Sequence, residues 1–374
     1  MIHNPFILEP YLSEEYFCDR EAETERIASL LENGSDVTLI SPRRLGKTGL
    51  ILHVFDRIAK AGRDYKMIYA DISASSTIDD FISILSGAVV NALSARQKIS
   101  SFFSHLGAIR PLVSYDPITG SPQVSFFYAS EEEKKTTLKQ LFDYLENCGH
   151  TVVFAIDEFQ QIREYDGVNM EAVLRSHIQN LHNVRFIFCG SKKHIMADMF
   201  SNAKQPFYES TSTVPLLKLP RDVYAAFIEK LFAKGGKRIA PEALNFILDW
   251  TRTHTFYTQK LCNQVYAASR NSVTVSDVRK AASEILASNL YNFLEIKRLV
   301  TSTQWKVLRA LSKEGETAHP TSLYFTQKYK ISAPSVLRAL DSLVEKELVL
   351  SEVSEDGVSY SVYNVFFSRF LENL

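Results

Sequence analysis

The sequence predicts an α/β fold: a parallel five-stranded sheet with crossover helices, then a helical domain, then a small domain of helices and a β-hairpin. Three observations predict this order. Over residues 1–219, short apolar runs alternate with helical patterns, as in a parallel sheet. Between residues 220 and 290 the strand patterns stop and helical patterns continue. After residue 302, helical patterns precede two strand patterns that flank a turn.

The composition is that of an ordinary globular protein. The chain has 374 residues, of which 45% are hydrophobic and 23% charged, and this length predicts two or three domains. The net charge of −1 gives no bulk basicity that would indicate a nucleic-acid or membrane partner. The cysteines (Cys18, Cys148, Cys189, Cys262) lack the spacing of a zinc site or a disulfide framework. Neither a signal peptide nor a membrane-spanning apolar run is evident, so we expect a cytoplasmic protein without membrane association.

The chain begins with an amphipathic helix and then enters the sheet. Residues 22–31 have an apolar face, and Asp19 is the expected N-cap residue of that helix. Residues 37–40 form the first expected strand, and a helical pattern starts at Gly49. The segment between them is Ser41-Pro42-Arg43-Arg44-Leu45-Gly46-Lys47-Thr48.

This strand–loop–helix context is typical of a phosphate-binding loop, the Walker A element. Backbone N–H groups of such a loop surround a β-phosphate, and the helix behind it adds positive partial charge. Lys47 would reach the β- and γ-phosphates, and the Thr48 hydroxyl would bind Mg²⁺. Ser41 replaces the first expected glycine, but a small residue can still make the turn. The predicted nucleotide contacts of this segment are Ser41, Pro42, Arg43, Arg44, Leu45, Gly46, Lys47, Thr48 and Gly49.

The next elements continue the alternation, with one interruption. A strand is expected at 66–71, and helices at 78–93 and 131–147. Residues 95–130 read as an insertion with a hairpin, whose strands flank a turn at 116–122. We interpret this insertion as exposed decoration rather than as a substrate site.

A second motif follows at residues 151–158. The apolar run 152–156 suits a strand that is buried on both faces, and it ends in Asp157 and Glu158. This is the Walker B pattern, in which Asp157 would hold Mg²⁺ and Glu158 would polarise the attacking water. The carboxyl ends of parallel strands share one edge of a sheet, so both carboxylates would lie near the phosphate loop. A strand that simply ends at a polar turn is the alternative, which the upstream Gly-Lys-Thr makes less favourable.

Two further strands complete the sheet. After a helix at 171–181, residues 184–190 form a buried strand followed by Ser191. Ser191 would hydrogen-bond the γ-phosphate or the attacking water, or it is only a strand-to-loop serine; both interpretations stay open. Residues 214–219 form the fifth strand, and Pro215 favours the start of a strand or a sheet edge.

The remaining chain is expected to form two smaller domains. The four helices expected in the helical domain are 222–232, 241–253, 256–270 and 276–286, and a connecting helix follows at 289–301. The last unit has helices at 303–311 and 322–329 and a third helix capped by Ser332. A hairpin of 348–353 and 358–362 and a helix at 365–371 complete a winged helix-turn-helix. The predicted domains are therefore 1–219, 220–290 and 291–374.

This order of elements resembles the AAA+ superfamily and its STAND-like relatives, above all the archaeal-type ATPase family of archaea and some bacteria. The resemblance covers nearly the whole chain, and its most specific stretches are residues 17–21, 42–48 and 156–158. It implies a P-loop NTPase core with a helical lid, which binds ATP and hydrolyses it with Mg²⁺. It also implies that Phe17, Asp19 and Arg20 lie near the adenine and ribose. Ser191 falls at the sensor-1 position.

Some residues depart from that family's pattern. Besides Ser41, Cys18 replaces a frequent glycine, and Ser210 stands where members often carry an arginine. The segment 195–213 contains Lys204 but no arginine, so we expect no arginine finger from it and slow turnover without a partner. Residues 253–257 lack the Gly and Pro that relatives often show, which leaves domain-closure coupling there open.

Three functions follow from these observations. The first is an ATP-dependent molecular switch that reports its nucleotide state to a protein partner through the winged helix. The second is a DNA-associated ATPase of the replication-initiator or regulator type. The charges after residue 302 do not favour DNA, since their balance is slightly acidic. On the outward face of the third helix only Arg338 suits a contact with DNA, and Glu345 on the same face would repel phosphate. The third is a nucleotide-binding scaffold without turnover. Homo-oligomerisation stays open.

Overall fold

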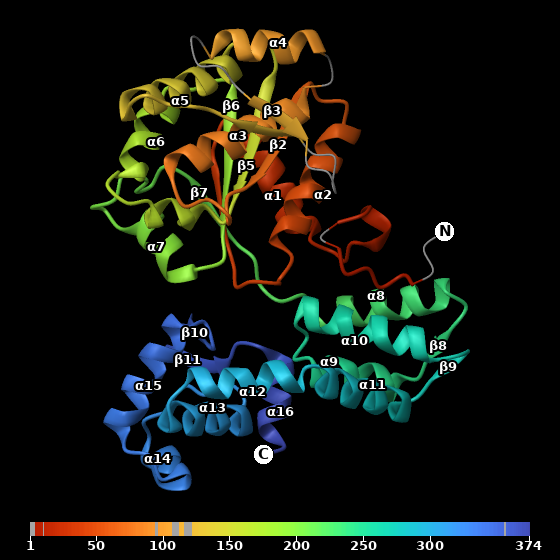
Figure 1. Cartoon of the computed structure of the whole chain (residues 1–374). Helices are drawn as coiled ribbons and strands as arrows, with labels where there is room; N and C mark the ends of the chain where they lie inside the picture. The colour runs from red at the N-terminus through yellow and green to blue at the C-terminus, as the bar shows by residue number, and fades with distance from the viewer. Residues whose placement is uncertain (1–3, 10, 94–95, 107–111, 116–121, 355–356) are drawn as a thin grey trace. The chain divides into compact units, whose positions relative to one another are not determined.

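The computed structural model describes residues 4–9, 11–93, 96–106, 112–115, 122–354 and 357–374. The chain divides into two compact units. The sheet unit comprises residues 9–217 (Figure 1). The C-terminal unit comprises residues 218–374 together with the chain's first described residues, up to Leu8.

The sheet unit is built on five parallel strands in the order β2-β5-β6-β1-β7. Their bounds are β1 Val37–Ile40, β2 Tyr65–Asp71, β5 Thr151–Asp157, β6 Val184–Gly190 and β7 Ser212–Pro215. This confirms the predicted five-stranded parallel sheet. The expected fifth strand at 214–219 was displaced, because the pairing with β1 begins at Ser212 and ends at Pro215. Pro215 lies on an edge strand, where its missing N–H breaks no ladder.

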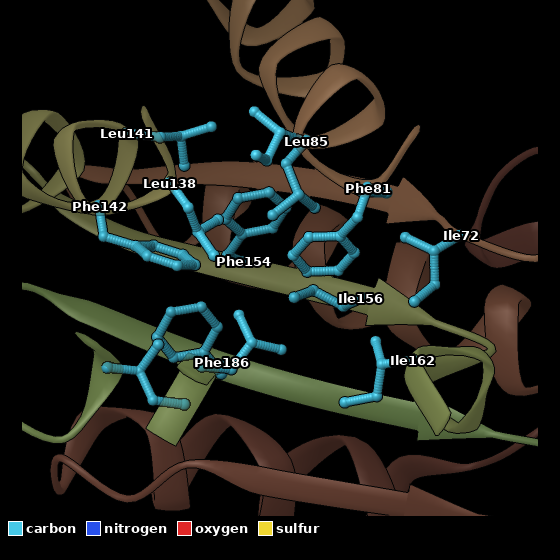
Figure 2. Packing of buried hydrophobic residues seen from close by; sticks show 14 of the residues in the cluster. Ile72, Phe81, Leu85, Leu138, Leu141, Phe142, Phe154, Ile156, Ile162 and Phe186 are labelled. Atoms are coloured by element: carbon cyan, nitrogen blue, oxygen red, sulfur yellow. The ribbon is translucent and has the colours of Figure 1, made fainter. Parts of the chain in front are cut away.

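The central strands are buried on both faces, and this explains why most of their residues are apolar. Alternate residues of β5 enter opposite cores: Phe154 packs on one side of the sheet and Val153 on the other. Figure 2 shows the first core, where Phe154 and Ile156 lie near Phe81 of α3 (Ile78–Ala92). The second core holds the apolar faces of α1 (Glu21–Glu32) and α2 (Lys47–Lys60).

The sequence pattern predicted some of the other elements of the sheet unit and missed the rest. α5 (Glu131–Glu146) and α6 (Met170–Ile178) lie near their expected ranges. α4 (Arg96–His105), α7 (Lys193–Ser201), η1 (Glu14–Tyr16) and η2 (Phe159–Glu164) were not expected. The inserted hairpin is present as β3 (Leu112–Tyr115) and β4 (Pro122–Ser125), while residues 116–121 of its predicted turn lie outside the described residues.

The start of α1 differs from the expectation. Arg20, not Asp19, occupies the N-cap position, and it makes no side-chain cap hydrogen bond. Both residues have left-handed backbone, with φ of 53° at Asp19 and 74° at Arg20. Asp19 therefore cannot cap the helix, because the chain turns once more before the helix begins.

The C-terminal unit contains the predicted helical segment and the predicted winged helix. The helical segment comprises α8 (Arg221–Lys234), α9 (Pro241–Trp250), α10 (Thr255–Ala268) and α11 (Val275–Ser288), with a short parallel pair, β8 (Arg238–Ile239) and β9 (Ser272–Val273). α12 (Leu290–Leu299) links it to the winged helix. That module comprises α13 (Ser302–Glu314), α14 (Leu323–Tyr329), α15 (Ala333–Glu345), β10 (Val349–Ser354), β11 (Gly357–Val362) and α16 (Val365–Glu372). Residues 355–356 of the predicted wing turn lie outside the described residues.

The last helix joins the winged helix to the helical segment. Arg369 donates hydrogen bonds to the backbone carbonyls of Asp249 and Trp250, each at 2.8 Å. Arg252 donates to Ser368 Oγ at 2.8 Å and to Glu372 at 3.2 Å. These bonds, with the contact between the rings of Trp250 and Phe366, explain why residues 218–374 form one unit.

The N-terminal residues belong to this same unit. Asn4 donates to the carbonyl of Asn263 (2.9 Å), and Asn263 donates to the carbonyl of Phe6 (2.7 Å). The Phe6 side chain is fully buried against Phe232 of α8 and Tyr266 of α10. The first residues are thus fixed to helices more than two hundred positions away in sequence. In the part of the chain that the structure describes, no helix is both long and apolar enough to cross a bilayer.

Candidate functional site

The 41–48 loop connects β1 to α2 with the backbone that its sequence predicts. Gly46 has φ of 100° and stands at the N-cap of α2. That backbone region strains any residue with a side chain, so a glycine is required here. Arg44 also has positive φ, at 66°, and alternation of this kind turns successive N–H groups toward the inside of a loop. The Ser41 hydroxyl is fully buried and donates to the Pro42 carbonyl at 3.0 Å, so a serine fits where a glycine was expected.

Lys47 lies inside this loop. Its side chain is buried, and Nζ donates to the carbonyl oxygens of Ser41 (3.1 Å) and Pro42 (3.2 Å). A buried ammonium is costly unless it is hydrogen-bonded, and the two carbonyls meet that need here. A lysine ammonium has three protons to donate, so these two carbonyls leave one further donor on Lys47 Nζ.

Asp157 ends β5 beside the loop, as predicted. Thr48 Oγ1 donates to Asp157 Oδ2 at 2.8 Å, and Tyr69 donates to the same oxygen at 2.9 Å. The other oxygen, Oδ1, accepts from the backbone N–H of Glu158 at 2.9 Å. Burial and the neighbouring Asp157 charge raise the pKa of Tyr69, so its hydroxyl stays a donor. The structure therefore brings Thr48 and Asp157 into direct contact across 109 positions of sequence.

Glu158 is held by a hydrogen-bonded chain at the same edge of the sheet. Its Oε2 accepts from Ser191 Oγ (2.6 Å) and from Gln160 Nε2 (2.5 Å). Arg43 Nε donates to Ser191 Oγ at 3.2 Å, which links the 41–48 loop to the end of β6. Glu158 itself has left-handed backbone, with φ of 56°, which turns the chain away from the strand. Strained backbone of this kind is common at functional sites.

Phe17, Asp19 and Arg20 lie in the sheet unit but are not joined to the Lys47–Asp157 cluster by hydrogen bonds among the described residues. The Arg20 side chain is 5% exposed and donates to Glu23 (2.7 Å) and to the carbonyl of Leu217 (2.6 Å). Leu217 is the last residue of the sheet unit, so Arg20 fixes the point where the chain leaves it.

Phe17 stacks on His53 of α2, with ring centroids 4.6 Å apart and an interplanar angle of 26°. Tyr11 packs edge-on against Phe17 at 5.6 Å and donates to Asp56 at 2.8 Å. The rings of Tyr11, Phe17 and His53 thus form an aromatic cluster on the flank of α2, and Asp56 is hydrogen-bonded to it through Tyr11. Of these four residues, the sequence analysis singled out only Phe17, which it expected near the adenine and ribose.

The residues around Asp157 fit a magnesium ion that is shared with phosphates. A hydroxyl and a carboxylate oxygen are the hard ligands that Mg²⁺ prefers, and it usually takes only one or two carboxylates beside phosphate oxygens and water. Among the described residues, no group of three or more His, Cys, Asp or Glu side chains is placed to hold a metal on its own. Thr48 and Asp157 would therefore be the protein's contribution.

The fold is that of an α/β protein with a five-stranded parallel sheet, followed by a helical segment and a C-terminal winged helix. A family model described as a probable winged helix domain matches residues 291–373. No curated protein matches the sequence.

Solved structures with the same fold cover nearly the whole chain. A Walker-type ATPase of Pyrococcus abyssi has a TM-score of 0.68 at 17% identity, over 98% of this chain and 99% of that one. The ORC2 protein of Aeropyrum pernix, solved as ADPNP–ADP complexes, has a TM-score of 0.62 at 18% identity, over 99% and 95%. The A. pernix ORC1 protein in complex with DNA has a TM-score of 0.54 at 15% identity, over 99% and 96%. At these identities the similarity concerns the fold.

Sequence reasoning missed several residues of this site. Gln160, Tyr69 and His53 were not singled out, although each bonds or stacks with a predicted site residue. None of them belongs to a motif of fixed spacing. Gln160 was the easiest to find, because it lies two positions after Glu158.

Proposed function

We propose that this protein is an ATP-binding, Mg²⁺-dependent ATPase that works as a molecular switch, with its C-terminal unit as the output module. The observation that carries the proposal is the direct contact of Thr48 with Asp157 beside the buried Lys47. Three separate stretches of sequence, each predicted to serve a nucleotide, meet at one edge of the sheet. The P-loop ATPase fold of the solved neighbours supports the same activity.

Binding would use the 41–48 loop. Its N–H groups and the N-terminus of α2 would surround the β-phosphate. Lys47 would exchange its carbonyl acceptors at Ser41 and Pro42 for phosphate oxygens. Thr48 and Asp157 would hold Mg²⁺, which when bound neutralises charge on the β- and γ-phosphates.

Hydrolysis would use Glu158 as the residue that orients water and takes its proton. Ser191 and Gln160 both donate to Glu158 Oε2, and so fix the carboxylate in one orientation. Ser191 would also reach the γ-phosphate, since Arg43 of the loop already contacts its hydroxyl. We expect slow turnover in the isolated chain, because the segment 195–213 offers no arginine to stabilise the transition-state charge.

Phosphate release from ATP tests this proposal. Wild-type protein with Mg²⁺ should release phosphate, and Lys47→Ala should lose both ATP binding and release. Glu158→Gln should keep binding but lose turnover by about 10²–10⁴-fold, the usual contribution of a general base. Lys139→Ala, on the exposed face of α5, is the matched control and should behave as wild type. Binding without turnover by wild type would favour the scaffold function, and wild-type turnover by Glu158→Gln would remove Glu158 from catalysis.

DNA binding through the winged helix is a second candidate. It is favoured by the family match at 291–373 and by the fold similarity to an ORC1 protein solved with DNA. The exposed face of α15 opposes it, because Arg338 is accompanied by Asp341 and Glu345. Arg338 also donates to the carbonyl of Pro334 in its own helix.

A gel-shift titration of duplex DNA at increasing salt tests this candidate. DNA binding predicts a shift that weakens with salt and is reduced by Arg338→Ala. Arg298→Ala, an exposed arginine on α12, serves as the control. The absence of any shift at low salt would leave a protein partner as the output.

A further inference from the structure

His53 is a buried polar group that the phosphate chemistry does not use. Its side chain is 1% exposed, and its Nε2 has no hydrogen-bond partner among the described residues. Buried polar atoms in native proteins are nearly always paired, since leaving one unpaired costs stability. His53 Nε2 therefore has a hydrogen-bonding capacity that no described residue of the chain uses.

The partners of the other ring nitrogen fix what Nε2 offers. The Tyr11 hydroxyl lies 2.8 Å from Asp56 Oδ2 and 3.2 Å from His53 Nδ1. A carboxylate can only accept, so Tyr11 donates its single proton to Asp56 and its oxygen accepts from Nδ1–H. Burial lowers the pKa of His53, so the ring is neutral near pH 7. Its one proton is then on Nδ1, and Nε2 is a bare acceptor.

The position of His53 on α2 relates it to the 41–48 loop. It lies six residues after Lys47, which is about 9 Å along the helix axis. Gly49 is four residues earlier and so lies on the same face of α2. Asp56 is one turn further toward the C-terminus of α2, and Nδ1 faces it through Tyr11, so Nε2 is directed away from Asp56.

We propose that His53 reads the nucleobase, accepting at Nε2 a hydrogen bond from the 6-amino group of adenine. The assignment rests on the nucleotide-binding function proposed above. A nucleotide whose phosphates lie at the N-terminus of α2 and whose ribose passes over Gly49 brings its base to this turn. Phe17, stacked on the imidazole, and Tyr11 fix the ring plane. Adenine presents a donor at position 6, whereas guanine and hypoxanthine present an acceptor there, so an acceptor at His53 selects ATP.

Equilibrium binding of nucleotide analogues tests the assignment without relying on turnover. Wild-type protein is titrated calorimetrically, with Mg²⁺, with ATP, ITP and purine riboside triphosphate, which has hydrogen in place of the 6-amino group. We expect purine riboside triphosphate and ITP to bind about tenfold or more weakly than ATP, because each leaves Nε2 unpaired. Equal affinities for ATP and purine riboside triphosphate would overturn the proposal, and this comparison needs no variant.

Two variants examine the hydrogen-bonded chain. His53→Phe keeps an aromatic ring against Phe17 but has no acceptor, and should reduce the preference for ATP over purine riboside triphosphate to within about twofold. His182→Phe is the same change at an exposed site and should leave the preference intact.

The Asn side chain of Asp56→Asn can donate to Tyr11, which then donates to His53 Nδ1 and moves the imidazole proton to Nε2. This variant should shift the preference from ATP toward ITP. An unchanged preference in His53→Phe would overturn the proposal, and an unchanged one in Asp56→Asn alone would remove the Tyr11 chain from it.

The same titrations separate this assignment from the proposed function. If wild type binds no nucleotide, the proposed function fails. If it binds all three nucleotides equally and Lys47→Ala abolishes that binding, the function stands and the role of His53 is wrong.

Discussion

Gly190 has no room for a side chain, and a larger residue there would displace the Gln160 side chain that holds Glu158. A Cβ atom built on Gly190 would lie 2.4 Å from Gln160 Oε1 and 2.5 Å from Met196 Sδ. Gln160 donates to Glu158 Oε2 from the same amide. A single added carbon would therefore displace the side chain that orients the expected catalytic carboxylate.

Gly190→Ala should destabilise the protein by about 1–3 kcal/mol, the usual cost of overpacking, and should lower phosphate release. Urea unfolding and the release assay measure the two effects. If the contact with Gln160 is the cause, the change should cost less in a Gln160→Ala background, which a double-mutant cycle reveals. Full additivity of the two changes would show that Met196 alone carries the clash.

Asp36 should make the folded protein less stable as the pH rises, which is the reverse of the usual effect of a carboxylate. Burial raises its pKa from the ordinary 3.8 to about 6, although its Oδ1 accepts from the backbone of Phe186 at 2.9 Å. The folded chain then holds this proton to higher pH than the unfolded chain does, so stability falls as the pH rises from about 4 to about 6.

Asp36→Asn keeps the acceptor but cannot ionise. It should gain stability over wild type at pH 8, by up to ~3 kcal/mol, and little at pH 4. Urea unfolding of both proteins at the two pH values measures the difference. A gain of the same size at both would show that the Asp36 charge is not the cause.

At the scale of the element, the helices differ in whether the N-cap side chain accepts a hydrogen bond from the first turn of the helix. Thr301 caps α13 in a capping box, in which its hydroxyl accepts from the Gln304 N–H and Gln304 bonds back to the Thr301 N–H. Ser332 stands at the N-cap of α15 as expected, but its hydroxyl bonds Ser335 Oγ and not the helix backbone.

Thr301→Ala should therefore cost about 1 kcal/mol, whereas Ser332→Ala should cost only a few tenths, because only the first leaves helix N–H groups unpaired. Both residues lie in the winged helix, so the thermal midpoints of the two variants compare like with like. Equal losses would mean that Ser332 caps α15 in solution.

Elements with long periodic patterns were predicted well, and short or context-dependent ones were not. The short strand at 37–40 and the strand at 184–190 also appeared as expected, because both lie inside the sheet and most of their residues are apolar and buried. The fifth strand was displaced because its position depends on pairing with β1 and not on its own residues. The prediction that Asp19 caps α1 was wrong, because the left-handed backbone at Asp19 and Arg20 leaves no pattern in the sequence.

The candidate site followed the same rule. Lys47, Thr48, Asp157 and Glu158 lie in motifs of fixed spacing, and the structure places all four at one edge of the sheet. Gln160, Tyr69 and His53 contribute as single side chains, and only the folded chain shows what they contact.

At the scale of the whole molecule, the two units are not consecutive stretches of chain. The sheet unit, residues 9–217, is inserted between the first residues and the rest of the C-terminal unit. Phe6, fully buried against Phe232 and Tyr266, is the main apolar contact of the N-terminal residues in that unit.

Phe6→Ala should destabilise the C-terminal unit by about 3–5 kcal/mol, the usual cost of removing a buried phenylalanine. Hydrogen exchange should then speed up in α8 and α10 while β5 and β6 keep their protection. Phe127→Ala, at a side chain that is 80% exposed, is the matched control and should change neither. Faster exchange in the sheet unit instead would show that Phe6 supports the fold as a whole.

The bonds between Asn263 and the N-terminal residues also constrain the order of events during synthesis. Asn263 and Phe6 are separated by 257 positions. At ordinary elongation rates the ribosome needs roughly 10–50 seconds to make that much chain. During this time the sheet unit can complete its own fold, while residues 4–8 still lack the helices α8 and α10 that they contact. The N-terminal segment is therefore made well before the helices that fix it, which leaves it open to chaperones and proteases in the interval.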